Sequence, residues 1–239
     1  MGKTLFWDFD GTLTYSPHLW SITMYDALKK QMPEYEGTVD DIRAVASGKV
    51  CSWDTRQKDY SEILGMKWWD FTERRFYEKY LELGICEETA RKAAASVHQE
   101  IIDPKRYGLY DDTLWALEES RRRGYKNYII SNNYPEMDEV MEKLGILQYF
   151  DDLIVSANVG IDKPDPGIFQ IALERAGNPE ECWMIGDNPR ADMQGARSVG
   201  MHTILVHRDV PCAEAEAILG SLREIFELDE FKKDETLCF

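Results

Sequence analysis

The sequence predicts an α/β fold, a Rossmann-like parallel sheet flanked by helices, into which an α-helical domain is inserted after the first strand. Beyond about residue 109, short apolar runs alternate with segments of helical periodicity, which is typical of a parallel sheet covered by helices. Between residues 15 and 105 the periodicity is helical, with hardly any strand signal. We therefore expect a core of residues 1–14 and 106–239 and a helical domain of residues 15–105.

The first strand is expected at Leu5–Trp7, an apolar run that ends in acidic residues. In the inserted domain, Pro17 suits an early helical position and Gly84 a helix end. The helices expected there are residues 17–32, 39–46, 54–64, 68–83 and 87–102. In the core we expect strands at residues 128–130, 153–155, 182–185 and 202–206, helices at 111–123, 135–144, 165–176 and 190–199, and a further helix at 213–227 in the acidic tail.

The composition excludes several classes of protein. The chain has 239 residues, of which 44% are hydrophobic, so wholesale disorder is ruled out. A formal net charge of −16 is the reverse of the basic surface that binds nucleic acid or an anionic membrane, and we expect neither partner. The five cysteines form no C-x-x-C pair, and we find no signal peptide and no apolar segment long enough to span a bilayer. These features predict a cytoplasmic protein.

The sharpest local signal is a pair of acids, Asp8 and Asp10, directly after the first strand. Residues i and i+2 of a strand point to the same side, so both carboxylates emerge together at the end of the sheet where ligands bind in such folds. Two carboxylates this close repel each other unless a hard cation such as Mg²⁺ lies between them. Gly11 then allows a sharp turn that brings main-chain N–H groups close to an anion.

Three further polar sites follow predicted strands or precede predicted helices. Ser131 and Asn132 come just after the strand at 128–130, which by itself is typical of a helix cap or turn. Lys163 stands before a helix start and alone would be an ordinary surface charge. Asp187 ends another apolar strand, and Asp192 follows five residues later, so this loop could complete a metal site.

Taken together, the four segments resemble the motifs of the haloacid dehalogenase superfamily of phosphohydrolases. These motifs are an Asp-x-Asp-Gly-Thr strand end, a Ser or Thr strand end, a Lys, and a Gly-Asp-x-x-x-x-Asp loop, and all occur here in order between about residues 3 and 207. The helical stretch at 15–105 looks like the small cap that many members insert at this point. The resemblance implies hydrolysis of a small phosphomonoester that depends on Mg²⁺ and passes through an aspartyl-phosphate.

The resemblance also implies a role for each matching residue. Asp8 would be the nucleophile and Asp10 the general acid and base. Asp187 would hold Mg²⁺ together with Asp8 and the main-chain carbonyl of Asp10, and Asp192 would be either a direct ligand or a support for the others. Lys163 would stabilise the transferred phosphoryl group. The remaining phosphate-binding groups would be Gly11, Thr12, Ser131 and Asn132.

Other activities of the superfamily remain alternatives. Dehalogenases lack the second acid of the first motif and phosphonatases replace it, so the presence of Asp10 disfavours both. Sugar phosphate mutases keep both acids but more often carry an aliphatic residue where Thr12 stands. A binding or regulatory protein without catalysis would not require the set of Asp8, Lys163 and Asp187. A phosphatase is therefore the leading hypothesis.

Substrate recognition is expected in the helical cap, which closes over the site in such enzymes. Lys49 and Arg56 of the cap, and His18 close to the first motif, are candidates for substrate contact, although each is also a plausible solvated surface residue. The aromatic residues of the cap, among them Trp68 and Trp69, are expected mainly to pack its core. We expect a small phosphorylated metabolite as substrate and a monomer or homodimer as the assembly.

Overall fold

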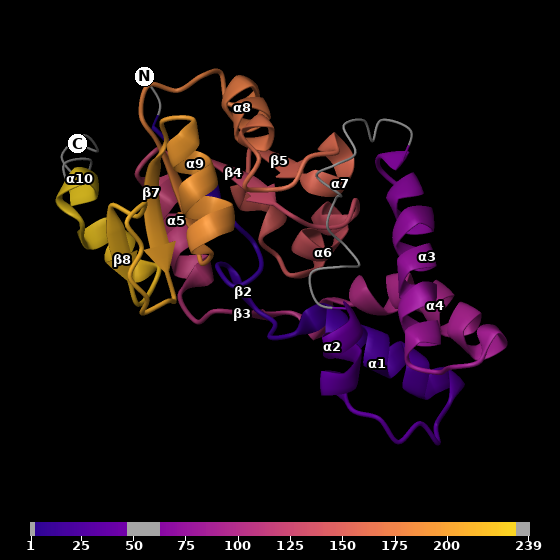
Figure 1. Ribbon diagram of the computed structural model, residues 1–239. Coiled ribbons are helices and arrows are strands. Elements are labelled where there is room, and N and C mark those ends of the chain that lie inside the picture. Colours follow the sequence, from indigo (N-terminus) through magenta and orange to yellow (C-terminus); the bar gives the residue numbers. More distant parts are fainter. Residues whose placement is uncertain (1–2, 47–62, 233–239) are drawn as a thin grey trace.

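The computed structural model describes residues 3–46 and 63–232 of the chain. Its centre is a six-stranded sheet in the order β5-β4-β1-β6-β7-β8, in which every pair of neighbours is parallel (Figure 1). The predicted α/β class is thus confirmed. The strands are β1 (Thr4–Trp7), β4 (Lys126–Ser131), β5 (Asp152–Val155), β6 (Cys182–Gly186), β7 (His202–Val206) and β8 (Ala217–Leu219).

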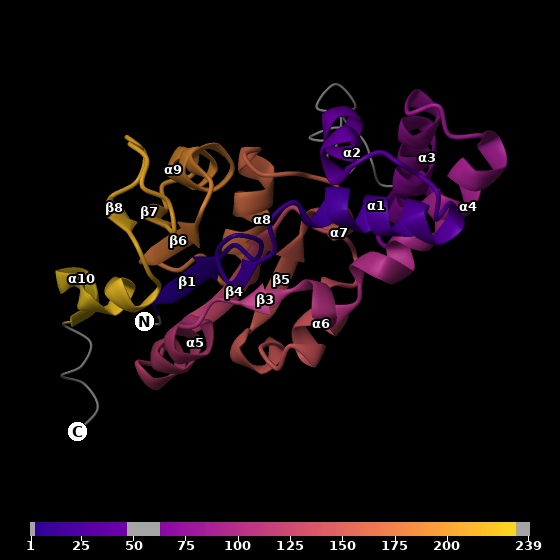
Figure 2. The same ribbon diagram turned by 90° about the horizontal axis from the view of Figure 1, so that it is seen from below.

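Strand β1 lies in the interior of the sheet and is buried along its whole length, which explains its unbroken apolar run. Its side chains alternate between two layers of core. Leu5 and Trp7 point into the layer covered by helices α5 (Thr113–Arg122) and α6 (Met137–Lys143). Phe6 points into the opposite layer, covered by α8 (Pro166–Arg175) and α9 (Gly195–Ser198). Figure 2 shows these two pairs of helices on opposite sides of the sheet.

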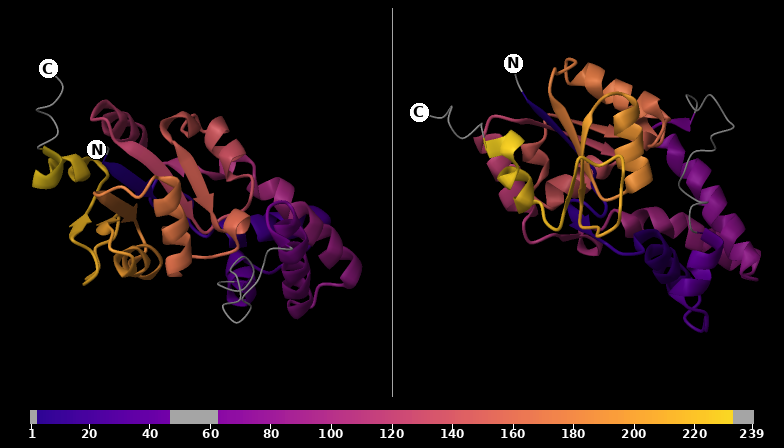
Figure 3. Two further views of the ribbon diagram at one scale, coloured as in Figure 1. Left: turned by 90° about the horizontal axis from the view of Figure 1, so that it is seen from above. Right: turned by 60° about the vertical axis from the view of Figure 1, so that its left-hand side comes forward.

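Four helices form a group to one side of the sheet (Figures 1 and 3). They are α1 (Leu19–Gln31), α2 (Val39–Ala46), α3 (Lys67–Glu82) and α4 (Glu87–Ile101), and their bounds lie within three residues of those predicted. The buried face of α4 consists largely of alanines, which let it pack closely against α1. The chain enters and leaves this group through a short antiparallel pair, β2 (Thr14–Tyr15) and β3 (Gly108–Leu109).

The predicted helix at 213–227 is wrong. Residues Ala217–Leu219 instead extend the sheet beside β7 as strand β8, and Arg223–Glu227 form a 3₁₀ turn before the short helix α10 (Asp229–Lys232). Helical propensity in this tail is overridden by the free edge of β7, which offers main-chain partners. The predicted helix at 190–199 is also divided, because Pro189–Gln194 form a π-helical turn before α9.

The remaining expectations concern short elements and membrane spans. The helix predicted at 54–64 lies outside the described residues except for its last two positions. The structure adds α7 (Ser156–Val159) and 3₁₀ turns at Pro104–Arg106 and Leu147–Tyr149, for which the sequence offered no signal. Within residues 3–46 and 63–232, no helix combines the length and the apolarity needed to cross a bilayer.

Candidate active site

Polar side chains from four loops meet at the edge of the sheet where its parallel strands end. The register pairs Trp7 with Ile129 of β4 and with Ile185 of β6, so Asp8 follows β1 level with the last residues of both neighbours. This edge is where α/β sheets bind ligands. It holds a cavity of about 160 Å³, here called the carboxylate pocket, which is lined by Asp8, Asp10, Ser131, Asn132, Lys163, Asp187, Asn188, Ala191 and Asp192.

Lys163 is buried in this pocket, with 5% of its surface exposed. Its ammonium group donates to Asp8 Oδ1 at 2.6 Å, to Asp192 Oδ1 at 2.6 Å and to the main-chain oxygen of Ile130 at 2.7 Å. All three of its hydrogens therefore have acceptors. Burial alone would lower the pKa of Lys163, but the carboxylates of Asp192 and Asp8 outweigh that effect and raise it. Lys163 thus stays a cation in contact with the predicted nucleophile.

Asn132 holds the loop that carries Lys163. Its side-chain oxygen accepts a hydrogen bond from the main-chain N–H of Lys163 at 2.7 Å, and its amide group donates to the main-chain oxygen of the same residue at 3.0 Å. This pair of bonds ties the end of β4 to the start of the α8 loop across 31 positions of sequence. The position of the lysine therefore depends on the amide of Asn132.

Asp10 lies beside Asp8 in the pocket, and two neighbouring side chains contact it. Asn133 Nδ2 donates to Asp10 Oδ2 at 2.9 Å, and Thr14 Oγ1 lies 3.4 Å from Asp10 Oδ1. Burial, followed by the negative charge of Asp8, raises the pKa of Asp10 from 3.8 to about 7. A carboxyl group of this kind exists both with and without its proton near neutral pH.

Asp187 and Asp192 approach Asp8 closely enough to share a metal ion. One carboxylate oxygen from each of the three residues lies within 4.8 Å of the others. Both oxygens of Asp192 are already engaged, one by Lys163 and the other by the main-chain N–H of Asn188 at 3.0 Å. This occupancy favours a supporting role for Asp192 and leaves Asp8 and Asp187 as the more available ligands. Burial and the charge of Asp8 raise the pKa of Asp187.

An arginine that the sequence analysis missed contacts Asp187. Arg208, two residues after β7, donates to Asp187 Oδ2 from Nε at 3.1 Å and from Nη2 at 2.6 Å. The side chain of Arg208 is 56% exposed, so the ion pair lies at the rim of the pocket. A basic residue after a predicted strand was the available signal, since strand β7 ends at the same edge of the sheet as β1 and β6.

The predicted turn at Gly11 exists, with φ at 86°. A Cβ at this position would lie 2.5 Å from Asp187 Oδ2, so only glycine fits without displacing that carboxylate. The main-chain N–H groups of Gly11 and Thr12 already donate to the oxygens of Thr14 and Phe9, at 2.8 and 3.4 Å. A phosphoryl group bound there has to share these donors with the turn itself.

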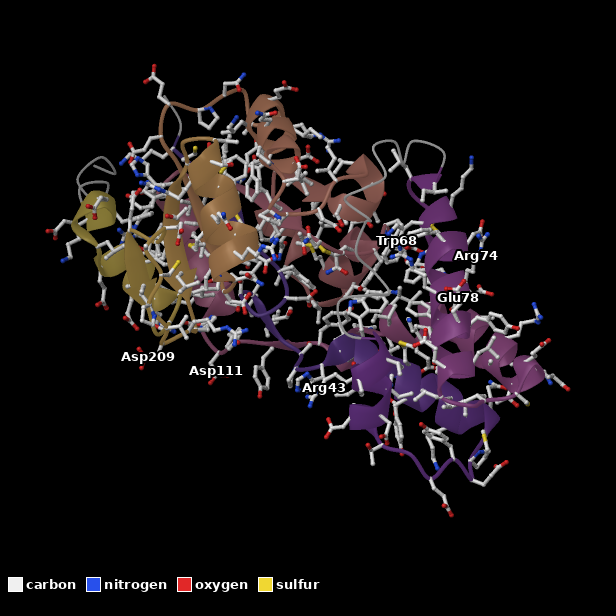
Figure 4. The ribbon with its side chains drawn as sticks, viewed as in Figure 1. Arg43, Trp68, Arg74, Glu78, Asp111 and Asp209 are labelled. Carbon is white, nitrogen blue, oxygen red and sulfur yellow. The ribbon has the colours of Figure 1, made fainter. Side chains whose placement is uncertain are left out.

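Of the three candidate specificity residues, the structure describes only His18. His18 is exposed at the start of α1 and contacts Arg43 of α2 at 2.9 Å, and it does not line the carboxylate pocket. Figure 4 shows Arg43 on α2 and labels Asp111 and Asp209 on loops of the core. Lys49 and Arg56 lie outside the described residues. Trp68 and Trp69 are buried among the inserted helices, as expected for core residues.

Comparison with known proteins identifies the family. The family described as haloacid dehalogenase-like hydrolase matches residues 3–200, a span that contains every residue of the carboxylate pocket. The chain belongs to this family. The resemblance inferred from the four sequence motifs is thereby confirmed.

Curated relatives of this haloacid dehalogenase-like hydrolase include two named phosphatases. The phosphoserine phosphatase of Thermus thermophilus is 38% identical over 162 residues, which cover 65% of this chain and 64% of that protein. The glyceraldehyde 3-phosphate phosphatase of Methanothermobacter thermautotrophicus is 31% identical over 126 residues, which cover 52% of this chain and 56% of that protein. The chain thus spans less than two thirds of the length of either relative.

Solved structures share the fold of this haloacid dehalogenase-like hydrolase. A HAD phosphatase from Thermococcus onnurineus superposes with a TM-score of 0.65 and 23% sequence identity, covering 94% of this chain and 96% of that one. At this identity the likeness concerns the fold, and the reaction has to be argued from the residues of the pocket.

Proposed function

We propose that this protein is a phosphatase that hydrolyses a small phosphomonoester through an aspartyl-phosphate on Asp8. The observation that carries the proposal is the contact of Lys163 with Asp8, beside a second carboxyl group, Asp10, in one small pocket. A nucleophile, an acid and a buried cation for the transferred group are the parts that phosphoryl transfer needs. The named phosphatases among the relatives support the same class of reaction.

In the first step, a carboxylate oxygen of Asp8 attacks phosphorus and forms the new P–O bond. The bond between phosphorus and the leaving oxygen breaks, its electron pair stays on that oxygen, and Asp10 supplies the proton that makes the leaving group an alcohol. Lys163 faces the attacking carboxylate and stabilises the negative charge that spreads over the phosphoryl oxygens. Ser131, which also lines the pocket, offers a hydroxyl to the same oxygens.

In the second step, water attacks the phosphorus of the aspartyl-phosphate. Asp10, now a carboxylate, takes a proton from this water, the bond between phosphorus and Asp8 breaks with its electron pair returning to the Asp8 oxygen, and inorganic phosphate leaves. The protonated Asp10 is ready for the next cycle. A dehalogenase has no need of this second acid, so its presence in the pocket favours a phosphatase.

The residues present fit a divalent cation. Asp8 and Asp187 present carboxylate oxygens to a common point, and the donor set is all oxygen, which Mg²⁺ prefers. We propose that these two residues and the main-chain carbonyl of Asp10 hold Mg²⁺, with Asp192 supporting the site through Lys163 and Asn188. When bound, the ion would offset the charge of the carboxylates and draw negative charge from the phosphoryl oxygens.

The substrate class follows from the small pocket. A volume of about 160 Å³ has room for a phosphoryl group, so the rest of the substrate must lie outside the pocket. We propose that residues 15–105 act as a cap that excludes large substrates, and that phosphoproteins are turned over poorly. A small phosphorylated metabolite, a cytoplasmic location and a monomer or homodimer remain predictions of the sequence.

The test is release of inorganic phosphate from a panel of small phosphomonoesters, measured with Mg²⁺ and with a chelator. Asp8→Asn is the matched blank, since its amide keeps the size of the side chain and cannot act as nucleophile. We expect release that requires Mg²⁺ and falls to background in the variant. Undiminished release by a pure Asp8→Asn preparation would refute the mechanism, and no release by the natural protein from any ester would refute the phosphatase assignment.

A further inference from the structure

We infer that Asn133 is a positioning residue that orients the carboxyl group of Asp10 for proton transfer. This inference rests on the proposed phosphatase reaction and assigns to Asn133 a role in its acid step. Asn133 lies on the loop between β4 and α6 and is 3% exposed. Its Nδ2 donates to Asp10 Oδ2 at 2.9 Å, a bond between residues 123 positions apart.

The orientation of the Asn133 amide is determined by its other end. Asn133 Oδ1 accepts a hydrogen bond from the main-chain N–H of Tyr134 at 3.0 Å, and only an oxygen can accept there. The atom that faces Asp10 is therefore the NH₂ group, a donor. The main chain of Asn133 is held as well, because its carbonyl oxygen accepts from the N–H of Ala157 at 3.3 Å.

The only other side chain bonded to Asp10 in the described part of the chain is a weaker partner. Thr14 Oγ1 lies 3.4 Å from Asp10 Oδ1 and 3.2 Å from the main-chain oxygen of Phe9. A hydroxyl has one hydrogen, so a bond to Phe9 leaves none for Asp10. The shorter contact from Asn133 then restrains the rotation of the carboxyl group, and it assigns Oδ2 as the oxygen that accepts.

The loop that carries Asn133 is anchored to the inserted helices. Tyr107 donates its hydroxyl hydrogen to the main-chain oxygen of Ile101 at 3.1 Å, so the 2.7 Å contact between the hydroxyls of Tyr107 and Tyr134 has Tyr134 as donor. Tyr134 itself is fully buried. Two residues further along, Glu136 accepts from Trp69 Nε1 at 2.7 Å. Asn133 therefore sits on a rigid support, as a group that orients another must.

The consequence for the reaction concerns the leaving oxygen. A general acid contributes about 10²–10⁴-fold when it is held within hydrogen-bond reach of that oxygen, and a carboxyl group free to rotate forfeits part of this factor. The loss of rate is large for a substrate whose leaving oxygen needs a proton and small for one whose leaving oxygen departs readily as an anion. A defect in folding or in phosphate binding would lower the rates of both kinds of substrate alike.

The experiment compares phenyl phosphate with 4-nitrophenyl phosphate, which are similar in size and differ in the basicity of the leaving oxygen. We would measure kcat/KM for both esters with Mg²⁺. This constant reports only the steps up to the transfer of the phosphoryl group to Asp8, and not the later hydrolysis of the aspartyl-phosphate. For Asn133→Ala we expect a fall of about 10- to 100-fold on phenyl phosphate and of less than about threefold on 4-nitrophenyl phosphate. We compare variants by the ratio of kcat/KM on 4-nitrophenyl phosphate to kcat/KM on phenyl phosphate. Both constants are measured on one preparation, so an unfolded fraction cancels from this ratio.

Two further variants separate positioning from packing. Asn133→Leu fills the same volume without a donor and should raise the ratio as Asn133→Ala does. Asn127→Ala removes another buried asparagine, which lies on strand β4 and donates its amide hydrogens to Ser120 Oγ and to the main-chain oxygen of Tyr149 rather than to Asp10. This variant should leave the ratio unchanged.

A rise in the ratio of about threefold or more in both Asn133 variants, absent from Asn127→Ala, supports the positioning role. Equal losses on both esters, loss of both activities to background, or the same rise in Asn127→Ala overturns it. If the natural protein releases phosphate from neither ester and from no other member of the panel, the proposed function fails first and the positioning role falls with it.

Discussion

Replacing Lys163 by methionine tests how strongly the carboxylate pocket depends on its buried cation. The methionine side chain approximates the length of the lysine stem but leaves Asp8 and Asp192 without the ammonium group that both contact at 2.6 Å. Removing one partner of a buried ion pair costs about 3–5 kcal/mol, because the remaining charge is neither paired nor solvated. For a chain of 239 residues this corresponds to a fall in Tm of about 6–20 °C.

The assay is thermal unfolding followed by circular dichroism in the presence of a chelator. The matched control is Lys126→Met, since Lys126 is exposed on β4 and its loss should change stability by less than about 0.5 kcal/mol. The deficit of Lys163→Met should also shrink between about pH 8 and about pH 5, because unpaired buried carboxylates take up protons more readily as pH falls. A Tm within about 2 °C of the natural protein would refute the reasoning, since the lysine would then contribute nothing to the pocket's stability.

Two further predictions concern a glycine of the site and an ion pair remote from it. Gly186→Ala would place a Cβ on the carboxyl group of Asp192. We therefore expect a loss of about 1–3 kcal/mol in unfolding free energy and at least a tenfold loss of phosphate release. A fully active variant would show that the backbone can move to accommodate the methyl group. Hydrogen bonds from Arg122, then from Arg123, lower the pKa of Glu119 from 4.5 to about 2, so its contribution to stability is present above about pH 4.5 and is lost as pH falls toward 2. Glu119→Gln should therefore cost about 1 kcal/mol at neutral pH, after allowance for solvent screening, and should weaken the acid dependence of urea unfolding; an unchanged pH profile would contradict the assignment.

Local patterns in the chain are sufficient to predict the layered core. The apolar run at Leu5–Trp7 is continuous because β1 is buried on both faces, and the helical periodicities of α1 and α4 reflect their buried stripes. The same reasoning predicts that residues just after strand ends share one edge of the sheet. Asp8 and Asp187 could therefore be named as candidates from their positions, whereas Lys163 was named through the resemblance to the family. All three lie together in the pocket.

Contacts between distant loops could not be predicted in this way. Asn133 meets Asp10 and Arg208 meets Asp187 only because β1 lies between β4 and β6, with β7 next in the sheet. An isolated Asn or Arg after a strand is a common turn residue, and its partner depends on which strand becomes its neighbour. The sequence therefore predicts no contact between Asn133 and Asp10 and gives no reason to single out Arg208.

The acidic tail shows that local propensity can also predict the wrong element. Residues 213–227 have helical propensity, but propensity is a weak preference, and Ala217–Leu219 pair with the open edge of β7 as a parallel strand.

The sequence by itself determined the class of fold, the family and the set of polar residues at the strand ends, because these follow from periodicity and short motifs. Only the tertiary structure decided that Lys163 is buried between two aspartates and that Asn133 points its donor at Asp10, because burial and hydrogen-bond partners depend on the order of the strands and the packing of the loops.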